Sequence, residues 1–221
     1  MRNRIQFAPG EFYHIYNRGV DKRDIFSDEY DIQRFLESMV VFNSVEPIGS
    51  IYERSFDDIH LLGGATPKLK LVSIIAYCLE PNHFHLILEQ IYEGGISEFM
   101  KRLAGGYTTY FNLREKRNGY LFQGVFKARH VNTNEYLLHL SAYVNLNDQV
   151  HQISLGGATH KLIRSSWEEY IGLVKEPMCK KDIILGQFKN KKEYQEYAED
   201  ALPIMLERKK TEREERALMM E

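Results

Sequence analysis

The chain lacks the sequence features of membrane, secreted and disulfide-bonded proteins. Its longest apolar run, LVSIIAYCL, is far shorter than the ~20 residues that a membrane-spanning helix needs. The opening residues, MRNRIQFAPGEF, hold no apolar stretch long enough for a signal peptide. Of the two cysteines, Cys78 and Cys179, neither is part of a CxxC pair, so no disulfide framework or zinc knuckle is indicated. We therefore expect a cytoplasmic protein that does not contact a membrane.

An excess of positive charge is also missing. Lysine and arginine number 29 against 31 aspartates and glutamates, which gives a formal net charge of -2. Proteins that bind nucleic acid often have a strongly basic balance, so DNA binding has to be judged here from local clusters of charge. The length of 221 residues and the 43% hydrophobic content predict one main core with room for an extension.

Periodicity predicts an alternation of strands and helices along the first two thirds of the chain. In chain order we expect a strand at 11–17, a helix at about 28–43 with Asp28 as its cap, a hairpin of strands at 70–79 and 83–90, a helix from about Ser97 that contains Gly105 and Gly106, a strand at 124–132 and a helix at 134–147. The order strand, helix, strand, strand, helix, strand predicts an α+β fold, a ferredoxin-like antiparallel sheet with helices on one face.

The chain changes character after about residue 175. From there on it is highly charged and predicted to be helical, and its last stretch, ERKKTEREERALMME, alternates acids and bases with few apolar residues. Such a pattern is typical of a solvated helix or a disordered tail. We therefore predict a main domain at 1–175 and a charged, helical C-terminal extension at 176–221.

Two histidines lie within the second strand of the hairpin, in the stretch PNHFHLILE. Because side chains alternate between the faces of a strand, His83 and His85 point to one face and can both reach a single divalent ion. With eight histidines in 221 residues, however, chance nearly accounts for one such pair. A half-exposed strand with two histidines therefore remains an alternative to a metal site.

A second polar group falls at helical spacing about sixty residues later, in NEYLLHLSAYVNLND. Tyr143 and Asn147 are four residues apart and share one helix face, with His139 one turn earlier. The carboxamide oxygen of Asn147 can complete a His/His/Asn metal site, and the phenol of Tyr143 can serve as a nucleophile. Core packing of an aromatic side chain in an amphipathic helix is the alternative for Tyr143, and the residues alone leave both open.

Four blocks of the chain, in this order and at this spacing, resemble the single-tyrosine HUH transposases. The blocks are EFYHIYNRGVDKRDIF, YCLEPNHFHLILE, GYTTYFNLREKRNGYLFQGVFKARHV and EYLLHLSAYVNLN, and the resemblance covers about residues 10 to 175. It is specifically to the branch of REP-associated tyrosine transposases within the IS200-like family. In that family the His-hydrophobic-His motif and a carboxamide hold a divalent ion, and a helical tyrosine attacks DNA.

The resemblance implies roles for particular residues. His83, His85 and Asn147 match the ligands of Mg²⁺ or Mn²⁺, and Tyr143 matches the nucleophile. His139 is a candidate general base, with a packing or surface role as the alternative. The implied activity is that of a single-stranded DNA transposase or nickase that cleaves and rejoins DNA at palindromic hairpins through a 5′-phosphotyrosine link.

A basic segment between residues 101 and 132 supplies candidate contacts to DNA. Its cations are accompanied by the single acid Glu115 and by several aromatic residues, a mixture that suits phosphate contacts and base stacking. Aromatic core and solvated cations are the alternative. The predicted DNA-binding residues are Arg18, Lys101, Arg102, Arg114, Arg117, Lys127 and Arg129.

Two questions stay open at this stage. Many relatives have a proline after the helical asparagine, whereas this chain has Asp148, which leaves room for a rival function: a hairpin-binding or regulatory protein that has lost catalysis. The helix and the histidines can also pair within one chain or across a dimer, so that both a monomer and a homodimer are compatible with the sequence.

One short repeat is unexplained by the fold. LGGATPKL at 62–69 returns as LGGATHKL at 155–162, with seven of eight residues identical. The codons GGT GGC GCC ACC encode Gly-Gly-Ala-Thr and equal their own reverse complement, so we hypothesise that two palindromic DNA elements entered the gene in frame as surface loops. Codons at 63–66 and 156–159 that do not form inverted repeats would refute this hypothesis.

Overall fold

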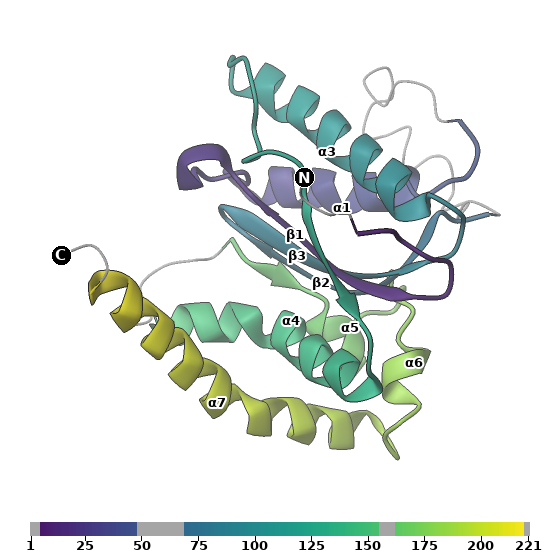
Figure 1. The fold of residues 1–221 in the computed structure, drawn as a ribbon, viewed down its shortest axis with the longest axis vertical. Helices are drawn as coiled ribbons and strands as arrows, with labels where there is room; N and C mark the ends of the chain where they lie inside the picture. The colour runs from purple at the N-terminus through teal and green to yellow at the C-terminus, as the bar shows by residue number, and fades with distance from the viewer. Residues whose placement is uncertain (1–4, 48–68, 155–161, 219–221) are drawn as a thin grey trace.

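The computed structural model describes residues 5–47, 69–154 and 162–218 (Figure 1). In chain order, its elements are β1 (Phe12–Arg18), the 3₁₀ turn η1 (Val20–Lys22), α1 (Glu29–Val41), β2 (Val72–Glu80), β3 (His83–Gln90), α3 (Gly95–Arg114), β4 (Lys127–Val131), α4 (Asn134–Ser154), β5 (Arg164–Ser165), α5 (Trp167–Ile171), α6 (Asp182–Leu185) and α7 (Lys191–Leu218). The repeated GGAT segments lie outside the described residues, and in the described part no helix is long and apolar enough to cross a membrane.

The strands form one antiparallel sheet in the order β4-β1-β3-β2-β5. The first four strands have the connectivity and order of a ferredoxin-like fold, which confirms the predicted fold class. The fifth strand, β5, consists of two residues and was not predicted. Its Ser165 pairs with Cys78 and extends the sheet beyond β2.

Helices cover both faces of this sheet (Figure 1). One face carries α1 and α3, the two helices of the ferredoxin-like core, and the other carries α4 to α7. The predicted cap is present, because the Asp28 carboxylate accepts a hydrogen bond from the backbone N–H of Asp31 at 3.2 Å. The added helix predicted to carry Tyr143 is α4, which lies on the face opposite α1 and α3.

Strand register decides which side chains meet which helices. Phe84 of β3 contacts Phe35 of α1, with ring centroids 5.3 Å apart, so this set of alternate residues faces the α1 and α3 layer. The other set faces α4, since the His85 ring lies 5.8 Å from the ring of Tyr143. His83 and His85 of β3 belong to this second set, and the paired residue Glu80 of β2 points to the same face.

The helix that carries Tyr143 is longer than predicted. We expected it to end at 147, but α4 runs on to Ser154. Asp148 has a backbone N–H that can donate within a helix, whereas a proline at this position would have removed that donor. The absence of proline therefore places Asn147 in the body of a helix and not at its end.

The C-terminal helix α7 packs on α4, and both are seen together below the sheet in Figure 1. Tyr194 and Ala198 of α7 are fully buried and belong to the same core as the sheet. Tyr194 accepts a hydrogen bond from the amide of Asn145 at 2.8 Å and lies 3.2 Å from the hydroxyl of Ser141, both on α4. The domain boundary at 175 stays a prediction, while the first part of the extension is packed against the helix of the site.

Candidate metal and tyrosine site

The site is built around the hairpin between β2 and β3. His83 and His85 lie on the α4-facing side of β3, with their ring centroids 5.2 Å apart. His85 is buried and 12% of the His83 side chain is exposed. The strand alternation predicted from the sequence thus holds, and the two rings are close enough to share one ion.

Each of the two histidines has its own hydrogen-bond partner at Nδ1. Nδ1 of His83 lies 2.6 Å from Oδ1 of Asn82, and the amide of Asn82 donates to the carbonyl oxygen of Lys22. Nδ1 of His85 lies 2.9 Å from Nε2 of His14 on the neighbouring strand β1. A partner that accepts at Nδ1 fixes the tautomer of an imidazole and turns Nε2 towards a metal.

His14 is suited to accept the proton of His85. Burial, with a smaller contribution from the positive charge of Arg129, lowers the pKa of His14 to about 4. At neutral pH this ring is therefore uncharged and has one nitrogen that can accept a hydrogen bond. His14 comes from β1, His85 from β3 and Arg129 from β4, so side chains of three strands meet at this point.

A buried carboxylate completes the group on the hairpin. Glu80 ends β2, pairs directly with His83 across the turn and is 2% exposed. One oxygen of its carboxylate, Oε1, lies 3.2 Å from Nε2 of His83. The ligand atoms of Glu80, His83 and His85 all lie within 4.8 Å of one another.

The helix α4 brings Asn147 and Tyr143 to the same place. The amide nitrogen of Asn147 donates to Oε1 of Glu80, and the ring of Tyr143 meets that of His85 edge-on at 84°. Tyr143 is partly exposed, whereas Asn147 is buried. The helical spacing that suggested a common face for these two side chains therefore places both against the hairpin, within a single chain.

These residues fit a divalent ion. Asn147 has a buried carboxamide oxygen, Oδ1, with no hydrogen-bond partner among the described residues. A buried polar atom of this kind costs about 1–3 kcal/mol unless something pairs with it. Two imidazoles, a carboxylate and a carboxamide oxygen are ligands that Mg²⁺, Mn²⁺ and related cations accept.

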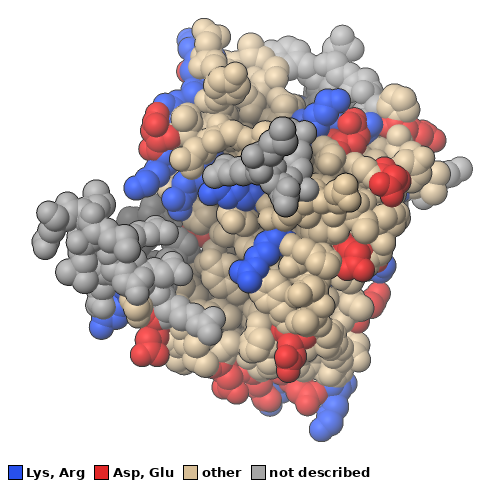
Figure 2. Space-filling view, in the orientation of Figure 1, with Lys and Arg blue, Asp and Glu red and all other residues tan. Residues whose placement is uncertain are grey.

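The predicted DNA-binding cations separate into two groups. Arg18, Lys127 and Arg129 share the sheet face of the histidines, because they pair with His83, Tyr16 and His14 in the strand register. The cations of α3 and its following turn belong to the opposite layer. In Figure 2, lysine and arginine side chains gather where α3 ends, while acidic side chains line the lower edge over α7.

Several cations of α3 form ion pairs and hydrogen bonds within the protein. Arg114 forms ion pairs with Asp28 and with the fully buried Asp31 of α1. Arg102 donates to Glu98 at 2.8 Å and to the carbonyl oxygen of Ser44 at 2.7 Å. The other two members also have partners: Lys101 lies 3.5 Å from Glu98, and Arg117 donates to Asn112 at 2.8 Å.

The candidate base lies away from the hairpin. His139 is exposed, and its Nδ1 is 3.3 Å from the hydroxyl of Tyr197 on α7. His139 lies one helical turn before Tyr143, and at that point of α4 its ring contacts α7. This contact favours the packing alternative for His139.

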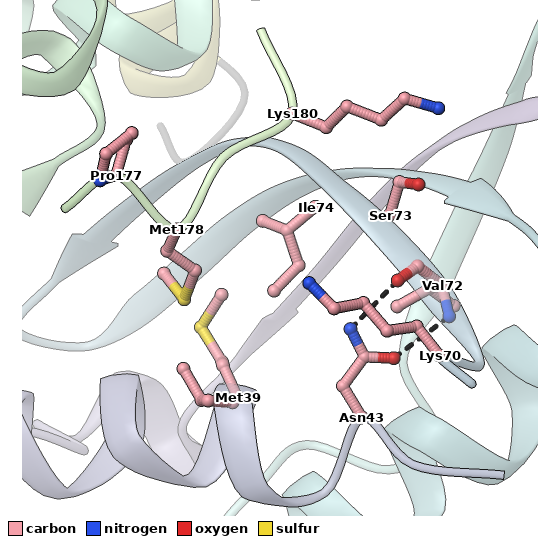
Figure 3. A pocket seen from close by; sticks show the side chains of 10 residues that line it. Met39, Asn43, Lys70, Val72, Ser73, Ile74, Pro177, Met178 and Lys180 are labelled. Carbon is pink, nitrogen blue, oxygen red and sulfur yellow. Dashed lines mark hydrogen bonds between the residues drawn. The ribbon is translucent and has the colours of Figure 1, made fainter. Parts of the chain in front are cut away.

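A pocket of about 260 Å³ lies at the other end of β2 (Figure 3). It is lined by Met39 of α1, by the start of β2 and by Met178 and Lys180 after α5. Val72 exchanges two hydrogen bonds with the side chain of Asn43 there, at 2.8 and 3.0 Å. Glu80 is the last residue of the same strand, so this pocket is separate from the group around the histidines.

Comparison with known proteins finds a family model that resembles one segment of the chain. Residues 64–147 match the family model described as "Transposase IS200 like". This segment of the chain is similar to the IS200-like transposases. One similar solved structure, described as "Structure of the REP associates tyrosine transposase bound to a REP hairpin", matches at 13% identity over 80% of this chain and 89% of that chain, with a TM-score of 0.47. No curated protein matches.

The segment that matches the IS200-like transposases includes His83, His85, Tyr143 and Asn147. The resemblance drawn from the sequence is thereby confirmed at the level of the family. Glu80 and His14 were not predicted as members of the site. A buried strand that ends in a glutamate beside a histidine was the available signal for Glu80, but His14 depends on pairing between β1 and β3, which the sequence does not reveal.

Proposed function

We propose that this protein is a metal-dependent single-stranded DNA transposase or nickase that cleaves and rejoins DNA at palindromic hairpins through a 5′-phosphotyrosine intermediate. One observation carries the proposal: Tyr143 and Asn147 of α4 meet His83 and His85 of β3 on one sheet face. The match of residues 64–147 to the IS200-like transposase model supports strand transfer as the reaction class.

His83, His85 and the carboxamide oxygen of Asn147 would hold the divalent ion, Mg²⁺ or Mn²⁺. An ion bound there would polarise the scissile phosphodiester and stabilise negative charge on its oxygens. Asn82 and His14 hold the two imidazoles in the tautomer that presents Nε2. The protein therefore supplies a preset ligand geometry, which needs little rearrangement when DNA arrives.

Tyr143 performs the covalent step. Its phenol loses a proton, its oxygen forms a bond to the phosphorus, the bond from phosphorus to the 3′-oxygen breaks, and that oxygen takes a proton to leave as a 3′-hydroxyl. The phosphodiester is exchanged for a phosphotyrosine ester of similar energy, so another 3′-hydroxyl can reverse the step and join new strands without ATP. A phenol ionises with a pKa of about 10, so positive charge near its oxygen assists the attack at neutral pH.

Arg18, Lys127 and Arg129 would position the DNA strand. They lie on the site's own sheet face, and Lys127 and Arg129 are exposed and stand over the rings of Tyr16 and Tyr136. Cations of this kind contact phosphates, and the partly exposed rings offer stacking surfaces for unpaired bases. The hairpin form of the substrate follows from the resemblance to the REP-associated branch.

Formation of a covalent adduct tests this function. Full-length protein is incubated with an end-labelled hairpin oligonucleotide and Mn²⁺, and a labelled band that survives denaturing electrophoresis is expected. Tyr143→Phe should remove the band, while Tyr92→Phe, a change at an exposed tyrosine before α3, should keep it. Binding without an adduct would instead support the rival hairpin-binding protein, and cleavage by Tyr143→Phe would indicate a phosphodiesterase that uses water.

A further inference from the structure

The turn between β2 and β3 places Glu80 beside the proposed metal ligands. Glu80 is the last residue of β2 and pairs with His83, the first residue of β3. Paired residues of neighbouring strands point to the same face, so the carboxylate shares the face of His83 and His85. At 2% exposure it is removed from water, which a carboxylate tolerates only with compensating partners.

The contact between Glu80 and His83 brings two electron-pair donors together. Asn82 donates to Lys22 through its amide nitrogen, so its oxygen is left to accept the Nδ1 proton of His83. In that tautomer Nε2 of His83 carries a lone pair, and it faces the carboxylate oxygen at 3.2 Å. Two such atoms approach closely when a cation, either a proton or a metal ion, lies between them.

The separation suits a metal ion. Ligands bound ~2.1 Å from a six-coordinate cation, at about a right angle to each other, lie roughly 3 Å apart. The 3.2 Å between Nε2 of His83 and Oε1 of Glu80 is close to that spacing. His85 falls within the same group, since the ligand atoms of all three residues lie within 4.8 Å of one another.

Glu80 also orients Asn147. The amide nitrogen of Asn147 donates to Oε1 of Glu80, which fixes the side chain so that the carboxamide oxygen is the atom without a partner in the described part of the chain. That oxygen is buried beside the same carboxylate. One glutamate thus contacts a helix ligand and a strand ligand at once.

We propose that Glu80 is a fourth protein ligand of the metal site, together with His83, His85 and Asn147. This inference rests on the metal site of the proposed function. A carboxylate adds a negative charge and a hard oxygen to two neutral imidazoles and an amide, so it should favour Mg²⁺ and Mn²⁺ over the softer Zn²⁺ that imidazoles also bind.

Metal titration of the full chain without DNA tests the proposal. Binding of Mn²⁺ is measured by calorimetry and by the electron paramagnetic resonance signal of free Mn²⁺. Glu80→Gln is expected to weaken Mn²⁺ binding at least tenfold and Zn²⁺ binding less. The matched control is Glu89→Gln, at the other end of the hairpin, where the carboxylate pairs with Lys180 at 3.3 Å.

The choice of glutamine separates a ligand from an orienting residue. Glutamine keeps an oxygen that accepts from Asn147, so Glu80→Gln should bind Mn²⁺ normally if the carboxylate only orients that side chain, and this result would overturn the inference. If Glu80→Gln binds Mn²⁺ as tightly as the wild type while His83→Gln binds it weakly, Glu80 is not a ligand. The metal site of the proposed function would stand in that case. A wild-type chain that binds no Mn²⁺ would refute both this inference and the metal site of the proposed function.

Discussion

At the scale of the residue, His14 is expected to control how His85 presents its ring. The two rings are joined through Nε2 of His14 and Nδ1 of His85 at 2.9 Å, in a buried place where His14 is neutral. His14→Phe keeps an aromatic ring in the site but removes the acceptor. Loss of such an outer contact usually weakens metal binding by about 10–100-fold, and we expect a decrease in this range for Mn²⁺, measured by calorimetric titration.

The control for this change is His130→Phe. His130 is next to Arg129 on β4 but pairs with Tyr13, so its side chain lies on the opposite face of the sheet, where it is 2.8 Å from Glu11. It should bind Mn²⁺ like the wild type. Equal metal affinities for the two variants would show that the contact between His14 and His85 does not support the site.

The residues of the site differ in how far the sequence could predict them. His83 and His85 follow from alternation within one strand, and Tyr143 and Asn147 follow from the period of one helix. His14 depends on which residues of β1 and β3 are paired, and no local pattern encodes that register, whereas Glu80 lies directly across the predicted hairpin turn from His83. Local spacing therefore predicted the two halves of the site, while tertiary pairing supplied the residues that join them.

At the scale of the element, α3 contains two neighbouring glycines with opposite surroundings. The helix runs without a break through Gly105 and Gly106, although glycine is a weak helix former. A methyl group on Gly106 would come within 2.5 Å of the ring of Phe42, whereas one on Gly105 would meet nothing within 4 Å. Gly106 is therefore required for the packing of α3 against the end of α1, a reason that lies outside the helix's own sequence.

These surroundings predict opposite effects of the same substitution. Gly105→Ala should stabilise the protein by up to ~1 kcal/mol, because alanine is the better helix former and has room. Gly106→Ala should destabilise it by about 1–3 kcal/mol through overpacking against Phe42. Urea denaturation followed by circular dichroism measures both, and a stabilising Gly106→Ala would contradict the packing described here.

The same two helices, α1 and α3, are also joined by Arg114. We predicted Arg114 as a DNA contact, but its guanidinium bonds Asp28 and the buried Asp31, which also accepts from Tyr110 at 3.0 Å. Arg114→Ala would leave a buried carboxylate without its cation and should lower the free energy of unfolding by about 2–3 kcal/mol in urea denaturation. Lys101→Ala, at an exposed ion pair, should change it by less than ~0.5 kcal/mol. Equal stability of the two variants would show that the ion pairs of Arg114 with Asp28 and Asp31 do not stabilise the fold.

The same contact gives a pH dependence. The hydrogen bond between Asp28 and Arg114 is the main cause that lowers the pKa of Asp28 below the ordinary value of 3.8. A lowered pKa stabilises the folded protein above that ordinary value, and this stabilisation is lost as the pH falls through the folded-state pKa. The difference in urea midpoint between wild type and Arg114→Ala should therefore be larger at pH 7 than at pH 3. A difference that grows on acidification would contradict it.

At the scale of the whole molecule, the basic segment 101–132 does not form one surface. Its first part belongs to α3, above one face of the sheet, and its last part forms β4, whose Lys127 and Arg129 point to the other face. Proximity in sequence could not separate the two, because the turn between them reverses the chain across the sheet edge. Composition predicted that the segment was basic, and the topology decides which of its cations point to the sheet face that α4 covers.

The position of α7 on α4 leads to a prediction about the whole chain. If 1–175 were an independent domain, a chain that ends at Asn190 would keep its stability. We expect the opposite, because removal of α7 takes Tyr194 from the core and leaves the buried Asn145 of α4 without its hydroxyl partner. A lost partner of this kind costs about 1–3 kcal/mol, and the apolar surface uncovered on α4 adds to it.

Because α4 also carries Tyr143 and Asn147, the loss of α7 should reach the site. The chain that ends at Asn190 should melt at a lower temperature and yield less covalent adduct with a labelled hairpin than the full chain. A chain that ends at Glu207 retains Tyr194 and Ala198 and serves as the matched control. Full adduct yield from the shorter chain would instead favour an independent domain at 1–175, with α7 resting on a helix that is already held in place by the sheet.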